Sequence, residues 1–167
     1  MKTDFRRWIV FETLLTNPNC KEEEKLSVLL PLCMQKLPST VDRAVKACLK
    51  FYSVNDEAKE KGAVSGKPIY SFLYDADLIF AAFMSQYGID LTKENMHWFK
   101  FRALFKGLGP ENKISEVMHI RSINLSQIKD TELKSKYREL KKIWELPDLR
   151  SDEEKETEFA SAVGQLF

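Results

Sequence analysis

Histidine residues are the first candidates for chemistry, and their surroundings favour a structural role. His97 and His119 lie far apart in sequence, and neither has a cysteine close by. His97 falls on the apolar face of an expected helix, where a hydrogen-bonded core histidine is commoner than a base or a metal ligand. His119 is expected at the surface or at a helix end. The chain also has no Gly-rich phosphate loop, no Cys-x-x-Cys pair and no His-Glu-x-x-His run.

Carboxylates and thiols are equally poor candidates for a reactive centre. Asp75 and Asp77 are two residues apart and therefore point to different sides of a helix, so capping and first-turn charge explain them best. Cys20, Cys33 and Cys48 are odd in number and widely spaced, which indicates free, buried thiols. We therefore predict a protein that is not an enzyme and that holds no cofactor and no metal.

Composition predicts one soluble globular protein. The chain has 167 residues, 44% hydrophobic and 31% charged, which is enough for a domain with a real core. Its net charge of +1 gives no general attraction for nucleic acid. No apolar run is long enough to span a bilayer, and the N-terminus lacks a signal-peptide core. We expect the protein in the cytoplasm, away from membranes.

Residues 74–108 are expected to organise the fold, because they hold the densest apolar pattern. A first helix can begin at Asp75 or Asp77 and end at Gly88. It is apolar nearly all round, which is typical of a buried helix. Thr92 can cap a second helix that Gly107 or Gly109 would end. Five large side chains share one face of this second helix, with His97 inside it: Trp98, Phe101, Leu104, Phe105 and Leu108.

The N-terminal part is predicted to be helical as well. Residues 4–15 have helical spacing, although a strand is not excluded for so short a segment. The next helix begins near Lys21 and should end or kink at Pro31. Ser39, with Asp42 three residues later, resembles a capping box for a third helix. Residues 55–68 have the composition of a linker. The prediction is an all-α, irregular multi-helix bundle around a buried central helix pair, with parts 1–54, 69–148 and a flexible acidic tail, 149–167.

A long helix is expected from Gln127 to Leu146, ended by Pro147. It carries a narrow apolar stripe, typical of a helix laid across a bundle or against another chain. The stripe consists of Leu133, Tyr137, Leu140 and Trp144. Many lysines lie on the opposite side, and Trp98 to Arg102 interleaves aromatic and cationic residues, as nucleic-acid-stacking proteins do. A solvated helix face and a core explain both patterns better, because glutamates alternate with the lysines.

The last segment, 151–167, changes character. It is strongly acidic up to Glu158 and then has four apolar residues at helical spacing. These are Phe159, Val163, Leu166 and Phe167. Such an end is typical of a docking peptide, but it is equally consistent with residues that close over a gap in the protein's own core.

Several of these segments also resemble a known family. The chain looks like the small proteins encoded in the tail modules of long-tailed phages (siphoviruses) and prophages of Gram-positive bacteria, just before the tape-measure gene. The segments in tandem, Gln-Tyr-Gly-Ile-Asp-Leu (86–91) and His-Trp-x-x-Phe-Arg (97–102), carry most of it. The resemblance covers roughly residues 4–147 and includes Tyr74, Asp75, Ala76, Asp77, Ile79, Ala82, Phe83, Lys100, Leu104, Asp4, Phe5, Arg6, Trp8, Ile9, Ile120 and Arg121.

This resemblance implies a helical, non-enzymatic tail assembly chaperone in the host cytoplasm. Its partner would be the tape-measure protein, with possible self-association or a second tail assembly chaperone. The stripe from Leu133 to Trp144 and the end from Phe159 to Phe167 are the hypothetical contact surfaces; the stripe could equally pack inside its own bundle. A structural subunit of the virion is the alternative. A DNA-binding regulator is a third hypothesis, which would require duplex binding that weakens steeply with salt.

Overall fold

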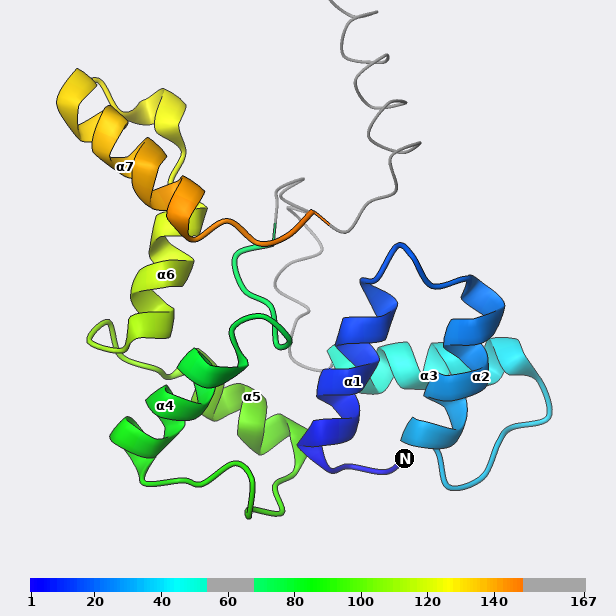
Figure 1. Cartoon of the computed structure of the whole chain (residues 1–167). Coiled ribbons are helices and arrows are strands. Elements are labelled where there is room, and N and C mark those ends of the chain that lie inside the picture. The colour runs from blue at the N-terminus through cyan, green and yellow to red at the C-terminus, as the bar shows by residue number, and fades with distance from the viewer. Residues whose placement is uncertain (54–67, 149–167) are drawn as a thin grey trace, which may run out of the picture.

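The computed structural model describes residues 1–53 and 68–148, and these residues are helical without a strand (Figure 1). The predicted all-α class is confirmed. Within the described part, no helix is long and apolar enough to cross a membrane. The elements are α1 (Phe5–Leu15), α2 (Glu22–Cys33), α3 (Val41–Ser53), α4 (Ala76–Tyr87), α5 (Trp98–Lys106), α6 (Lys113–Ser122), the 3₁₀ turn η2 (Leu125–Gln127) and α7 (Thr131–Ile143).

Three helix boundaries show how local chemistry shapes the N-terminal part. Asp4 caps α1 by accepting a hydrogen bond from the Arg6 N–H, which removes the strand alternative. The helix α2 does not end at Pro31 but runs to Cys33. Proline removes only one backbone donor there, and burial of the last turn offsets that loss. The capping residue of α3 is Thr40, whose hydroxyl accepts from the Arg43 N–H at 3.4 Å, so the Ser39 prediction was wrong by one residue.

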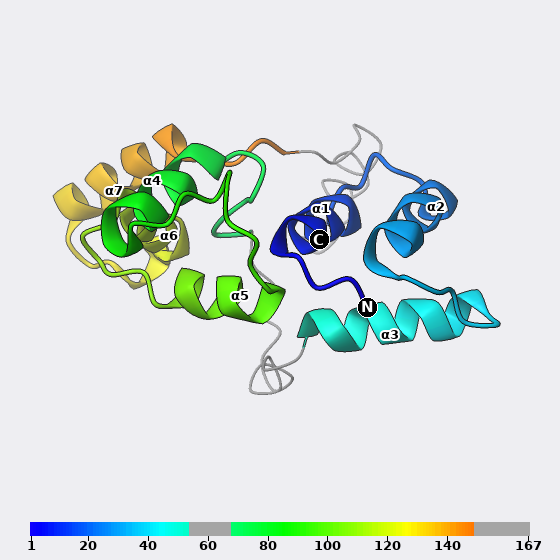
Figure 2. The same ribbon diagram turned by 90° about the horizontal axis from the view of Figure 1, so that it is seen from below.

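Stacked aromatic rings form the centre of the core. The rings of Phe5 and Phe101 are 4.8 Å apart, and those of Phe83 and Phe101 are 5.2 Å apart. Trp8 and Trp98 are completely buried beside them. Figure 2 shows α5 beside α1 and α3, so the N-terminal helices and the α4–α5 pair share one core. Burial of these rings confirms that Trp98 and Phe101 are core residues and not a stacking surface.

The α4–α5 region agrees with the prediction at one boundary and differs at others. α4 ends at Gly88 with φ 65°, the expected left-handed cap. However, α4 is buried on one side only, because Phe80 and Met84 are 36% and 42% exposed. α5 begins at Trp98, and Thr92 lies in the preceding turn. The prediction that His97 is a core residue is wrong, because His97 is exposed. It caps α5 instead, and its Nδ1 accepts a hydrogen bond from the Phe99 N–H at 3.1 Å.

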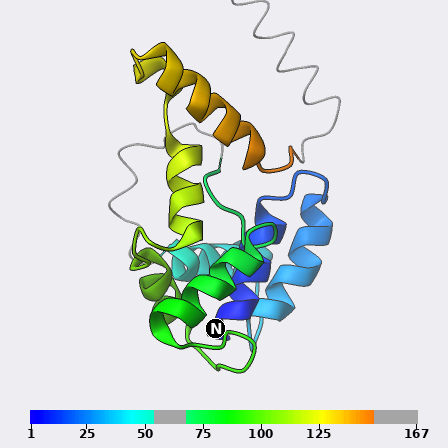
Figure 3. The same ribbon diagram turned by 60° about the vertical axis from the view of Figure 1, so that its left-hand side comes forward.

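α6, η2 and α7 extend from one end of the molecule (Figures 1 and 3). α6 is anchored by buried Ile114, Val117 and Ile120, while His119 is exposed as expected. The predicted long helix 127–146 is shorter than expected. Asp130 caps it by accepting from the Leu133 N–H at 2.8 Å, so α7 begins at Thr131.

Candidate partner-binding surface

α7 is the helix with the least burial in the described chain. It packs against α6 and η2, and none of its residues is buried. The four residues of the predicted stripe belong neither to the core cluster nor to the side chains packed against it. Leu133 is 43% exposed, whereas Tyr137, Leu140 and Trp144 are half-buried. The apolar stripe therefore extends the fold outwards and does not complete its core.

The C-terminal end of α7 is tied firmly to α6. The Lys141 ammonium donates to the carbonyl oxygens of Arg121 at 2.5 Å and Ile123 at 2.7 Å, and lies 3.4 Å from that of Ile120. These carbonyls belong to the end of α6, where a cation also interacts favourably with the helix dipole. In return, Arg121 Nε donates to the Trp144 carbonyl at 2.6 Å. α7 is thus held at one end, and its N-terminal half projects from the body.

A buried ion pair connects this end of α7 to the start of α4. Both Arg121 Nη atoms donate to the Asp75 carboxylate, at 2.6 and 3.0 Å, and Nη1 also reaches the Ile69 carbonyl at 3.2 Å. The Asp75 carboxylate accepts in addition from the Ser71 N–H at 2.8 Å. Asp75 therefore occupies the predicted N-cap position of α4, but its side chain makes no capping hydrogen bond there. It holds three segments together.

One side of α7 combines three apolar residues, of which two are exposed and Leu140 is half-buried, with one exposed lysine. At 100° per residue, Leu133, Lys136, Leu140 and Ile143 fall on one side. Ile143 is 70% exposed, the largest value among the exposed large apolar residues of the described chain. The stripe prediction omitted it, although its position three residues after Leu140 is the signal that could have revealed it. We call these four residues the outer face of α7.

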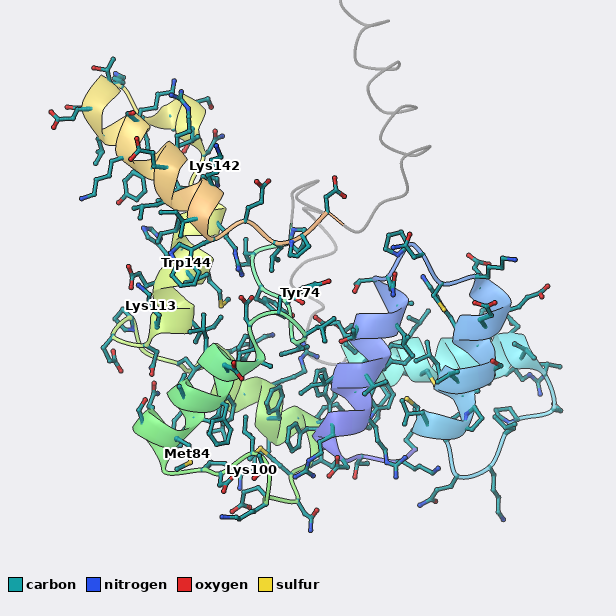
Figure 4. All side chains as sticks on the ribbon, viewed as in Figure 1. Tyr74, Met84, Lys100, Lys113, Lys142 and Trp144 are labelled. Carbon is teal, nitrogen blue, oxygen red and sulfur yellow. The ribbon has the colours of Figure 1, made fainter. Side chains whose placement is uncertain are left out.

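The inner side of α7 faces α6. There the Lys113 ammonium lies 5.2 Å from the centre of the Trp144 ring, a cation–π contact (Figure 4). Trp144 is also the residue whose carbonyl Arg121 binds. Trp144, one residue of the predicted stripe, therefore makes contacts within the protein. The exposed residues of the outer face remain available for contact with another surface.

The other predicted contact residues cannot be placed. Phe159, Val163, Leu166 and Phe167 lie outside the described residues, as do residues 54–67 of the predicted linker.

Several residues that carry the family resemblance act as structural ties. Arg6 donates to the carbonyls of Leu91 at 2.9 Å and Glu94 at 2.6 Å, which fixes the loop before α5. Gln86 Oε1 accepts from the Gly109 N–H at 2.9 Å and from Asn112 Nδ2 at 2.6 Å. Gln86, a polar residue on α4, thus holds the connection between α5 and α6. These residues position elements and do not form a binding site.

A cavity of about 360 Å³ lies between α1, α3, α5 and α6. Tyr52, Trp98, Arg102 and Phe105 are among its lining residues. Tyr52 donates its hydroxyl hydrogen bond to Glu12, and burial together with the Glu12 charge raises the pKa of this tyrosine. The cavity adjoins both ends of the undescribed residues 54–67, since Tyr52 and Ile69 line it, so it supports no ligand assignment.

The prediction of free, buried thiols is confirmed for two of the three cysteines. Cys33 and Cys48 are free and buried, on α2 and α3, whereas Cys20 is only partly buried. A hydrogen bond with Cys48, together with burial, raises the pKa of the Cys33 thiol, so this sulfur is a poor nucleophile. In the described residues, no three His, Cys, Asp or Glu side chains form a group that could hold a metal.

Comparison with known proteins identifies a family. A protein-family model described as "Bacteriophage Gp15 protein" matches residues 1–146. No curated protein and no solved structure matches the chain. The family match ends just after α7, and so it includes the outer face but not residues 151–167.

Proposed function

We propose a function from one premise: the chain belongs to the Bacteriophage Gp15 protein family. Our proposal is a non-catalytic tail assembly chaperone. It would bind the tape-measure protein in the host cytoplasm and keep it soluble until the tail tube surrounds it.

The observation that supports this proposal is the exposed outer face of α7. A tape-measure protein is a very long helical chain whose apolar faces have no partner before the tube forms. An exposed helix with an apolar stripe can cover such a face by helix-to-helix packing. Leu133 and Ile143 are 43% and 70% exposed, so they are accessible without any rearrangement of the core.

The way α7 is attached also fits this role. Lys141 and Arg121 hold its C-terminal end, and its N-terminal half projects past the end of α6 (Figure 3). A partner helix can therefore lie along the outer face without disturbing the aromatic core around Trp98. Phe159, Val163, Leu166 and Phe167 are retained as a second proposed contact with the same partner.

Co-expression with the tape-measure protein of the same phage tests the proposal. We expect the wild-type chain to raise the soluble fraction of that protein and to co-purify with it. The double variant Leu133→Ser/Ile143→Ser should lose the complex, because both side chains are exposed and their replacement leaves the fold intact. Arg138→Ser/Lys142→Ser, on the opposite side of α7 (Lys142 in Figure 4), is the matched control and should retain it.

Two results would contradict the proposal. The first is an unchanged solubility of the tape-measure protein with no complex formed. The second is the presence of the chain in purified, complete phage particles. A chaperone should be absent from particles, so its stable retention there would favour a structural tail or connector subunit instead.

A further inference from the structure

The outer face of α7 has the spacing of a helix that packs along one other helix. Leu133 and Leu140 are seven residues apart, and so are Lys136 and Ile143. These four residues therefore fall at the a and d positions of two heptads, which form the seam of a coiled coil. The pattern favours a single helix as the occupant of the outer face.

One edge of the outer face is acidic. At 100° per residue, Glu132 and Glu139 lie about 20° and 40° beyond Ile143, at the g positions beside the seam. Both are exposed, and within residues 1–53 and 68–148 neither carboxylate has an ion-pair partner. The helix dipole explains an acid in the first turn, where Glu132 lies, but not Glu139 in the middle of α7.

The other edge of the outer face is turned towards α6. Tyr137 and Trp144 lie there, at the e positions, and both are half-buried. The Trp144 ring is in contact with the Lys113 ammonium (Figure 4). A helix laid along the outer face therefore meets charge at its border only on the side of Glu132 and Glu139.

The other basic residues of α7 do not alter the charge of this border. They lie at b, c and f positions, which point away from a partner helix, and salt screens charges at that distance. These residues are Lys134, Arg138, Lys141 and Lys142.

A second copy of α7 is a poor occupant in either direction. In an antiparallel pair the g positions of the two helices face each other, so glutamate would meet glutamate. In a parallel pair the g positions face the e positions, which are Tyr137 and Trp144 and carry no positive charge. The two Lys136 ammonium groups would also oppose each other in the seam. The occupant is therefore a helix of different sequence.

We propose that the outer face of α7 binds an amphipathic helix whose apolar stripe is bordered by lysine or arginine residues seven positions apart. These cations would pair with Glu132 and Glu139. An acidic or polar residue of the partner would face Lys136, and a polar group in a seam fixes the register of the two helices. Such charges select the partner more than they add affinity.

The inference rests on the proposed function in one respect, the use of the outer face for binding, and it adds the chemistry of the segment that is bound. The thirteen residues of α7 rise about 20 Å, so the contact is short and a weak, reversible complex is expected. The attachment of Lys141 to α6 orders α7 beforehand, which lowers the entropic cost of binding.

Binding of two synthetic helices to the full chain tests the inference. Each peptide has three heptads with leucine at a and d. One carries lysine at e and g and the other glutamate, so both repel their own kind and stay monomeric. By calorimetric titration, the lysine peptide should bind about tenfold more tightly, and added salt should reduce this difference. Leu133→Ser/Ile143→Ser should abolish the binding of both peptides, which locates the site.

Charge substitutions on the chain provide a second measurement. Glu132→Lys/Glu139→Lys should reverse the preference between the two peptides, and Glu132→Gln/Glu139→Gln should only remove it. Glu22→Lys/Glu23→Lys makes the same charge change at exposed positions of α2, at the other end of the molecule (Figure 1), and should keep the wild-type preference. Unchanged hydrogen exchange in α1 and α5 would show that the fold is intact in each variant.

Three results would overturn the inference: neither peptide binds, the glutamate peptide binds equally well or better, or Glu132→Lys/Glu139→Lys keeps the preference for lysine. If the tape-measure protein bound the wild type and this variant equally, the inference would fail while the proposed function held. Selective binding of the lysine peptide without any tape-measure complex would have the opposite meaning.

Discussion

Asp75 and Arg121 form a buried two-point ion pair that joins the start of α4 to the end of α6. Their side chains are 4% and 9% exposed, and the two N–O distances are 2.6 and 3.0 Å. Arg121 also binds the carbonyls of Ile69 and Trp144, so one guanidinium organises four segments. The planar fork of arginine suits this task, whereas a lysine offers only a point charge.

Loss of this pair should be strongly destabilising. Arg121→Met leaves the Asp75 carboxylate buried without its cation, which typically costs about 3–5 kcal/mol of unfolding free energy. Denaturation by urea measures the loss. Lys46→Met, in the exposed pair of Lys46 with Asp42, is the control and should cost no more than about 0.5 kcal/mol. A similar small loss in both variants would show that the buried pair contributes little.

Lys141 should control how firmly α7 is attached. Its ammonium satisfies carbonyls at the end of α6, and each hydrogen bond to a charged group contributes about 1.5–3 kcal/mol. Lys141→Met should therefore speed hydrogen exchange throughout α7 and leave α1 unaffected. Lys142→Met removes the neighbouring exposed lysine and should have no such effect. If both variants matched the wild type, the attachment would depend on other contacts.

The loss of stability on substitution of Gly88 should depend on backbone strain and not on steric clashes of the new side chain. Its φ is 65°, and a Cβ added there would meet no atom within 4 Å. Gly88→Ala should therefore cost about 1 kcal/mol from the left-handed conformation. Gly88→Asn should cost less, since asparagine accepts this conformation more readily, and thermal unfolding can rank the two. Equal losses would indicate that the cap has lost its left-handed geometry.

Asp90 should make stability depend on pH in acid. Hydrogen bonds from Thr92, with its hydroxyl at 2.6 Å, and the ion pair with Lys93 lower the pKa of Asp90 to about 2. Because the folded pKa lies below the unfolded value of about 3.9, the carboxylate stabilises the fold above about pH 4, and this contribution is lost as the pH falls towards 2. Asp90→Asn should flatten the dependence of Tm on pH in that window. If Tm fell with decreasing pH in the same way for the wild type and for Asp90→Asn, this prediction would be contradicted.

The sequence by itself determined the helical class, several ends of helices and much of the core. Helical spacing of apolar residues is a local pattern, and so are the helix ends at Gly88 and Gly107. Trp98 and Phe101 were identified as core residues because large aromatic side chains are rarely left in water.

Tertiary structure alone decided which apolar faces found a partner. The pattern of α4 is apolar nearly all round, yet Phe80 and Met84 are exposed, because the number of packed neighbours is a property of the whole fold. The same applies to His97, which was expected in the core. A helix capped by Thr92 would begin at residue 93, but α5 begins five residues later, so His97 is the capping residue and does not lie on the apolar face of the helix.

The same distinction applies to the candidate surface. Sequence spacing identified the stripe with Leu133 and Leu140, but the contact of Lys113 with the Trp144 ring placed Trp144 against α6, and its exposure added Ile143 to the outer face. The partnership of Asp75 with Arg121 joins residues 46 positions apart. No local pattern encodes such a pair, because it exists only once α4 and α6 have packed together.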